Sequence, residues 1–162
     1  MTEQHRPSVV VAVVMEREAS PNRWEDWRFK LVDVIASEPA FGDSPRLLRD
    51  DGHFAQTLYP GFELELFADQ AEGYFLNLGS GAPVWFVMWR LDDTDPSRAW
   101  PEAVSLSYNE AGRWLDAQER VDNVPLPPEL AQWLQAYTDV HYRPEPKKRK
   151  RPASFLSPDQ RG

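Results

Sequence analysis

The chain lacks cysteine altogether, so its 162 residues offer no disulfide, thiolate metal site, iron–sulfur ligand or cysteine nucleophile. It also lacks a long hydrophobic run. The longest early one, residues 9–15, stops at Glu16, whereas a membrane-spanning helix needs about 20 apolar residues and a signal peptide needs a small-residue cleavage site. We therefore expect a cytoplasmic protein without a membrane span.

Positive charge is scarce over most of the chain and concentrated at its end. Residues 1–142 carry 11 Lys and Arg against 24 Asp and Glu, a balance of -13, whereas residues 143–162 carry 7 against 2, a balance of +5. The acidic body argues against nucleic-acid binding, because phosphate neutralisation requires a cationic face. Any such contact would fall to the tail, which holds five consecutive cations: Lys147, Lys148, Arg149, Lys150 and Arg151.

Seven segments have the alternating or wholly apolar pattern of β-strands and are separated by turn-forming residues: 8–18, 24–37, 54–60, 62–68, 74–80, 84–91 and 103–109. The apolar set of 24–37 changes phase after Leu31, which predicts a bulge or a sharp bend. Segment 84–91 is apolar on both faces, as in a central strand. The predicted fold is mainly β, an antiparallel barrel of about seven strands that is compatible with a pleckstrin-homology-like barrel.

The last third of the body has helical spacing. We expect one helix after Asn109, taken as its N-cap, and an amphipathic helix over 128–142 that begins at Pro128 and caps the barrel. Its apolar stripe consists of Leu130, Trp133, Leu134, Tyr137 and His141. Residues 1–142 then form a single β-barrel domain with C-terminal helices. Residues 143–162 form a disordered basic tail, because their prolines and charge prevent a packed fold.

No catalytic motif is present. His5, His53 and His141 have no metal-binding partner at helical spacing, and Glu63 and Glu65 have the spacing of a solvated strand face. We therefore predict no catalytic residue, no metal site and no cofactor. Serine, glycine and acidic residues elsewhere do not assemble into a nucleophile or phosphate-binding motif.

Two groups of residues are candidates for binding. Trp85 and Trp89 share one face of segment 84–91, where they either fill the core or line a groove or pocket for a ligand or peptide. The five cations of the tail either dock on an acidic protein surface or have no specific role. Both alternatives stay open at this level.

Four stretches, residues 13–35, 71–91, 104–134 and 141–152, resemble the bacterial domain of unknown function family 3305. The similarity runs in order over residues 9–152. It implies a small cytoplasmic protein associated with molybdenum-dependent formate dehydrogenase and its maturation factors, and it implies no catalytic residues.

Together these features predict a non-catalytic accessory protein. Its expected partners are formate dehydrogenase subunits or maturation factors, bound through the basic tail. The first alternative is a barrel that binds a small molecule or cofactor in a pocket lined by Trp85 or Trp89. The second is weak nucleic-acid binding through the tail, which would be strongly salt-dependent.

Overall fold

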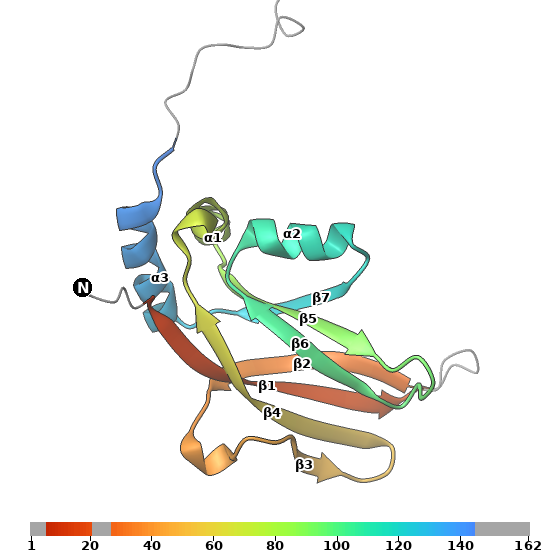
Figure 1. Cartoon of the computed structure of the whole chain (residues 1–162). Coiled ribbons are helices and arrows are strands. Elements are labelled where there is room, and N and C mark those ends of the chain that lie inside the picture. The colour runs from red at the N-terminus through yellow and green to blue at the C-terminus, as the bar shows by residue number, and fades with distance from the viewer. Residues whose placement is uncertain (1–5, 21–26, 145–162) are drawn as a thin grey trace, which may run out of the picture.

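A computed structural model describes residues 6–20 and 27–144 of the chain. Its strands form two antiparallel sheets, and helices cover one side and one end of them (Figure 1). The four-stranded sheet has the order β2-β1-β4-β3, with β1 at Ser8–Ala19, β2 at Trp27–Ala36, β3 at Arg46–Asp50 and β4 at Phe54–Glu65. The three-stranded sheet has the order β6-β5-β7, with β5 at Val84–Leu91, β6 at Ala99–Ser105 and β7 at Arg120–Pro125. The helices are α1 at Ala71–Gly79, α2 at Tyr108–Asp116 and α3 at Pro128–His141.

The expected barrel is not closed. No ladder joins the two sheets in the part of the chain that the structure describes, so the molecule is mainly β but open, and the pleckstrin-homology-like barrel is not confirmed. The sheets instead face each other across one hydrophobic core, to which β1 contributes Val11, Val13 and Met15 and β5 contributes Trp85 and Val87. Apolar burial between the sheets replaces the missing hydrogen bonds as the force that holds them together.

Strand β5 is covered on both faces, as its sequence predicted. Trp85 and Val87 point into the core, while Phe86 and Met88 on the opposite face are also buried. Helix α2 covers that second face (Figure 1). There the Phe86 ring meets the Tyr108 ring edge-on. A strand with two apolar faces therefore lies at the centre of its sheet, between β6 and β7.

The predicted bulge in β2 is confirmed. Asp33 pairs with Val14 and Leu31 with Met15, so Val32 is the extra residue. A second bulge lies in β4, where Pro60 and Gly61 together stand opposite Ala12. Gly61 adopts a positive φ of 85°, which glycine tolerates best. This bulge lets the chain continue as one strand where the sequence had indicated two, 54–60 and 62–68.

Residues 74–80 are not the strand that the sequence predicted but most of helix α1. Tyr74, Leu76 and Leu78 alternate, which favoured a strand, yet Leu76 is exposed. The buried face is instead helical, formed by Ala71, Gly73, Tyr74 and Asn77.

Strands β3 and β7 were missed. Strand β3 lies between the predicted strands 24–37 and 54–60, and all five of its residues are exposed, so it has no apolar alternation to detect. Strand β7 follows α2 and pairs with β5. Helix α2 also begins earlier than expected, because its N-cap is Ser107, whose hydroxyl accepts a hydrogen bond from the Glu110 N–H (3.1 Å), rather than Asn109.

Helix α3 starts at Pro128 as predicted and packs beside α1 at one end of the sheets (Figure 1). Leu134 is fully buried, and Leu130, Trp133 and Tyr137 are half-buried against the core. His141 lies on the exposed side of the stripe, with its ring 4.2 Å from that of Tyr137. None of the described helices has the length and apolar character needed to cross a membrane.

Candidate docking groove between the sheets

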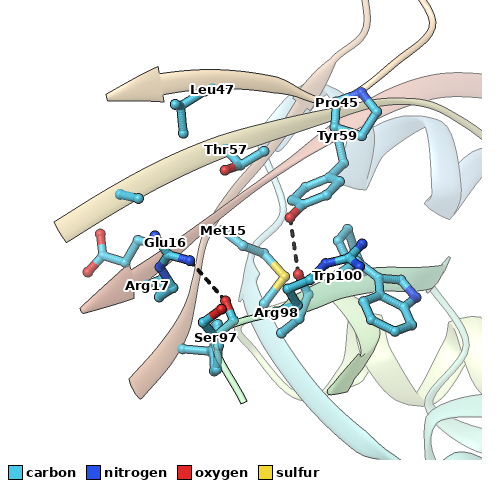
Figure 2. Close-up of a pocket in the computed structure, with 14 residues that line it drawn as sticks. Met15, Glu16, Arg17, Pro45, Leu47, Thr57, Tyr59, Ser97, Arg98 and Trp100 are labelled. Atoms are coloured by element: carbon cyan, nitrogen blue, oxygen red, sulfur yellow. Dashed lines mark hydrogen bonds between the residues drawn. The ribbon is translucent and has the colours of Figure 1, made fainter. Parts of the chain in front are cut away.

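The junction between β4 and the edge strand β6, which we call the seam, contains a half-open groove with a volume of about 470 Å³ (Figure 2). Strands β4 and β6 contact each other but belong to different sheets. Strand β3 extends the four-stranded sheet beyond the seam and contributes the outer wall. The groove is thus a consequence of the sheets not closing into a barrel.

Strand periodicity places the lining side chains. Ala55, Thr57 and Tyr59 alternate along β4, so all three point to the same side of the sheet and into the groove. The opposite wall is the segment 97–101, which leads into β6, and Arg17 of β1 reaches up from the floor (Figure 2). With Phe29 of β2 and with Pro45 and Leu47 at β3, five segments of the chain therefore meet here.

Two side chains of the larger sheet bind carbonyls beside the edge of the smaller one. The Tyr59 hydroxyl donates a hydrogen bond to the Ala99 carbonyl (3.1 Å), and the Arg17 Nη1 donates one to the Ser97 carbonyl (3.0 Å) (Figure 2). Edge carbonyls that no strand pairs need such partners. Burial raises the pKa of Tyr59, so its hydroxyl stays protonated and able to donate.

The groove is cationic although the body of the protein is acidic. Arg17 and Arg98 both line it, and Glu16 is the only acidic residue among the lining residues. The Arg17 guanidinium stacks on the Trp27 ring at 4.4 Å, and its Nε is buried with no hydrogen-bond partner among the described residues. The Arg98 side chain is 66% exposed and lies 3.7 Å from Asp92 Oδ2. Two guanidinium groups are thus placed to meet an acidic ligand.

The wall that carries Arg98 is organised by two carboxylates. Asp92 Oδ1 accepts hydrogen bonds from the N–H groups of Thr94 (2.8 Å) and Asp95 (3.1 Å), and Asp95 Oδ1 accepts from the N–H of Ser97 (3.0 Å). For Asp92 the Thr94 backbone N–H is the main cause of a lowered pKa, and for Asp95 it is the Ser97 hydroxyl. Both carboxyls therefore stay ionised at neutral pH and hold the loop in shape.

The outer part of the groove is apolar and exposed. Leu47 on β3 lines it and is 58% exposed, and Pro45 and Trp100 lie nearby. Leu48, the next residue of β3, is 49% exposed and is the extra residue of a bulge between Leu47 and Arg49. Neighbouring exposed leucines on an edge strand are a feature that proteins usually avoid unless a partner covers them.

The two tryptophans selected from the sequence lie elsewhere. Trp85 is 2% exposed in the core, and Trp89 is half-buried, with its indole N–H donating to Asp122 Oδ2 (2.9 Å). Neither lines the groove at the seam. The ligand pocket suggested for Trp85 and Trp89 stays a prediction. The five cations, Lys147, Lys148, Arg149, Lys150 and Arg151, lie outside the described residues.

Sequence reasoning did not find the groove because its residues follow no local pattern. Arg17 lies on β1, Leu47 on β3 and Arg98 just before β6, and only the fold brings them together. Across the described ranges, 6–20 and 27–144, no group of three or more His, Asp and Glu side chains converges as a metal-ligand set.

The fold and the groove define an open, mainly β protein with an unpaired seam between its sheets. The chain belongs to the family described as "Protein of unknown function (DUF3305)", whose model matches residues 10–151. This confirms the family resemblance seen in the sequence. No curated protein and no solved structure matches the chain.

Proposed function

We propose that this protein is a non-catalytic accessory protein that binds an extended segment of a protein partner in the groove at the seam. The observation that carries this proposal is the groove itself, where an exposed edge-strand leucine, Leu47, lies beside two guanidinium groups, those of Arg17 and Arg98. A half-open groove beside an edge strand fits a polypeptide better than a small solute, because an extended chain can pair with the edge and place alternate side chains in the hollow.

The chemistry of the groove specifies the segment. Apolar side chains of the partner would cover Leu47, Pro45 and Trp100, and an acidic side chain would meet the guanidinium groups of Arg98 and Arg17. Carboxylate–guanidinium hydrogen bonds are about twice as strong as neutral ones. The preferred partner segment is therefore extended, apolar and acidic.

The resemblance to the family suggests the partners. We propose subunits of a molybdenum-dependent formate dehydrogenase, or its maturation factors, as the proteins that carry this segment. The role is assembly or support of that enzyme, and the accessory protein itself performs no chemical step in it.

The first test uses two exposed leucines of the full chain. Leu47 is 58% exposed in the groove and Leu115 is 57% exposed on α2, so the two sites are matched in type and exposure. We expect Leu47→Asp to weaken binding to purified formate dehydrogenase or its maturation factors at least 10-fold in calorimetry, since a carboxylate there opposes both the apolar contact and an acidic partner. Leu115→Asp should leave the affinity unchanged.

A second pair of variants tests the charge preference. Arg98→Glu should weaken binding and reverse its salt dependence, whereas Arg113→Glu on the exposed face of α2 should change it little. Equal affinities for wild type, Leu47→Asp and Arg98→Glu would exclude the groove as the docking site. An absence of binding to any of these proteins would exclude the partners.

A small-molecule site is the second candidate, because a volume of about 470 Å³ falls within the range of ligand pockets. In this alternative the groove binds a cofactor or its precursor in place of a protein segment. Saturable binding of a cofactor or precursor to wild type but not to Arg98→Glu, with no binding of protein, would favour it.

A further inference from the structure

The other end of the seam contains a second cleft with the opposite charge. Its volume is about 360 Å³, and it lies between the C-terminal ends of β4 and β6 and the start of α1. Leu64, Tyr74 and Leu106 line its interior. Four acidic residues also line it, Glu63, Glu65, Asp69 and Glu110, and no Lys or Arg is among its lining residues.

These carboxylates have few internal partners. Glu110 Oε1 accepts a hydrogen bond from the Ser105 hydroxyl (2.6 Å), and Glu65 forms a loose ion pair with Arg6 at 3.9 Å between side chains that are 39% and 57% exposed. Such an exposed pair contributes little. A cleft lined by four acidic residues and by apolar ones is suited to long cationic side chains, whose stems pack on apolar surface while their charged ends reach carboxylates at its border.

The described chain ends beside this cleft. The ring of Tyr142, just after α3, stacks on Phe75 of α1 at 4.5 Å, which fixes the direction in which the chain leaves the helix. The next two residues, Arg143 and Pro144, line a hollow together with Asp69 and Glu72. Asp69 borders both this hollow and the acidic cleft, so the last described residue, Pro144, lies near the cleft.

We propose that residues 145–162 fold back along the seam and place the cations of residues 147–151 in the acidic cleft. From Pro144 these cations are three to seven residues away, a reach of roughly 10–24 Å for an extended chain. The charges complement each other, since the segment 143–162 carries 7 Lys and Arg against 2 Asp and Glu. Attachment to the same chain also raises the effective concentration of the tail at the cleft.

The order of residues in the tail matches the order of surfaces along the seam. After the cations come Phe155, Leu156 and Asp159. Beyond the acidic cleft the seam offers the groove with its exposed Leu47 and the two guanidinium groups. The groove is lined by the N-terminal parts of β4 and β6, and the acidic cleft by their C-terminal parts. A tail that enters from α1 therefore runs antiparallel to both strands.

The lengths agree as well. Eight residues of β4 separate Glu63 in the acidic cleft from Ala55 in the groove, a distance of about 26 Å at the rise of a strand. Eight residues also separate Arg151 from Asp159 in the tail, so Asp159 can reach Arg17 and Arg98 while the cations remain in the cleft.

The tail then acts as an internal competitor for the groove. This consequence rests on the proposed function, because a partner segment that binds the groove must displace Phe155, Leu156 and Asp159. Partners with an acidic, apolar segment displace the tail most readily. A partner that binds the groove more weakly than the tail does is excluded.

The absence of cysteine makes a direct test simple. A single Ala153→Cys or Ser157→Cys in the full chain accepts one nitroxide label at a known place. At low salt we expect the label at 153 to broaden amide signals of residues 62–66 and 104–106, and the label at 157 to broaden those of 57–59 and 97–101. Replacing the five cations by Gln should remove the broadening, as should about 0.5 M NaCl.

A charge-matched pair of triple variants locates the contact. Glu63→Gln with Glu65→Gln and Asp69→Asn should release the tail, whereas the same loss of charge at three exposed carboxylates elsewhere, Glu18→Gln, Asp116→Asn and Glu129→Gln, should not. No broadening in the wild-type chain, or equal release by both triples, would overturn the proposal. Broadening that occurs only between a labelled and an isotope-enriched second chain would also overturn it, in favour of exchange between copies.

These measurements contain no partner, so their failure leaves the proposed function standing. Conversely, the tail can dock even if formate dehydrogenase does not bind. One further measurement depends on both proposals, the docking of the tail and the binding of the partner. With all five cations replaced by Gln, the protein should bind its partner several-fold more tightly.

Discussion

The end of the molecule covered by α1 and α3 differs from the seam in how fully its apolar side chains are buried and its polar groups are hydrogen-bonded. At the covered end Leu134 and Trp85 are almost fully buried, and Asn77 uses its whole amide in hydrogen bonds. At the seam every residue of β3 is exposed, and two side-chain hydrogen bonds stand where a strand ladder is missing. The difference indicates that the covered end provides stability and the seam is available for binding.

The largest effect is expected at α3. Leu134→Ala should lower the free energy of unfolding by about 2–5 kcal/mol, because it leaves a cavity at a position that is 0% exposed. Val140→Ala, on the same helix at a position 59% exposed, should change it by less than about 0.5 kcal/mol. Chemical denaturation of both variants checks this. Similar costs would mean that α3 is not part of the stable end.

Asn77 fastens α1 to two strands. Its Nδ2 donates to the carbonyls of Val84 (2.9 Å) and Leu106 (3.0 Å), and its Oδ1 accepts from the Val84 N–H (3.0 Å). Asn77→Leu should cost about 2–3 kcal/mol, since it preserves volume but leaves these backbone groups without partners. Faster amide exchange at Val84 should accompany the loss. An unchanged exchange rate there would contradict this role.

Two helical glycines, Gly73 in α1 and Gly112 in α2, test how closely these helices pack. A Cβ at Gly73 would overlap the Ser107 side chain, whereas one at Gly112 would meet nothing. Gly73→Ala should therefore cost about 1–3 kcal/mol by forcing α1 away from α2. Gly112→Ala should stabilise by about 0.5–1 kcal/mol through helix propensity. Thermal unfolding measures both, and effects of the same sign would show that α1 and α2 are not closely packed.

Alkaline pH should loosen the covered end. Burial raises the pKa of Tyr74 to about 12, and its hydroxyl oxygen accepts a hydrogen bond from the Phe67 N–H (3.0 Å). A group with a raised pKa favours folding fully below its unfolded value of about 10, and this contribution is lost as the pH rises from 10 to about 12. Tyr74→Phe should flatten the fall in the unfolding midpoint over that window. An equally steep fall in the variant would assign the pH dependence to other groups.

The smallest effect on stability is expected at the seam. Leu47→Asp should leave the free energy of unfolding within about 0.5 kcal/mol of wild type, because the side chain is already 58% exposed. Equilibrium denaturation checks this. A cost near that of Leu134→Ala would mean that the seam belongs to the structural core. Loss of binding in this variant would then reflect unfolding and would not identify the docking site.

The parts of the fold that could be predicted are those with strong local patterns. The phase change after Leu31 revealed the bulge in β2, the wholly apolar segment 84–91 revealed the central strand, and Pro128 revealed the start of α3. Each of these signals lies within a single element, where burial alone determines which residues are apolar.

The remainder depended on contacts between elements. Tyr74, Leu76 and Leu78 alternate like a strand, and only the packing of Gly73 on Ser107 and the hydrogen bonds of Asn77 show why the chain is helical there. Strand β3 has no pattern because neither of its faces is buried. The groove joins Arg17, Leu47 and Arg98 from separate segments, so no local pattern could predict it. The number of strands, seven, agrees with the prediction, but a strand count does not say whether the strands form one closed barrel or two open sheets.

Amide hydrogen exchange of the full chain, alone and with saturating purified formate dehydrogenase or a maturation factor, shows most directly where a partner docks. If the seam is the docking surface, exchange should slow in β3 and in segment 97–101 and stay unchanged in α2. Slowing that is confined to α2, or spread evenly over the molecule, would contradict it.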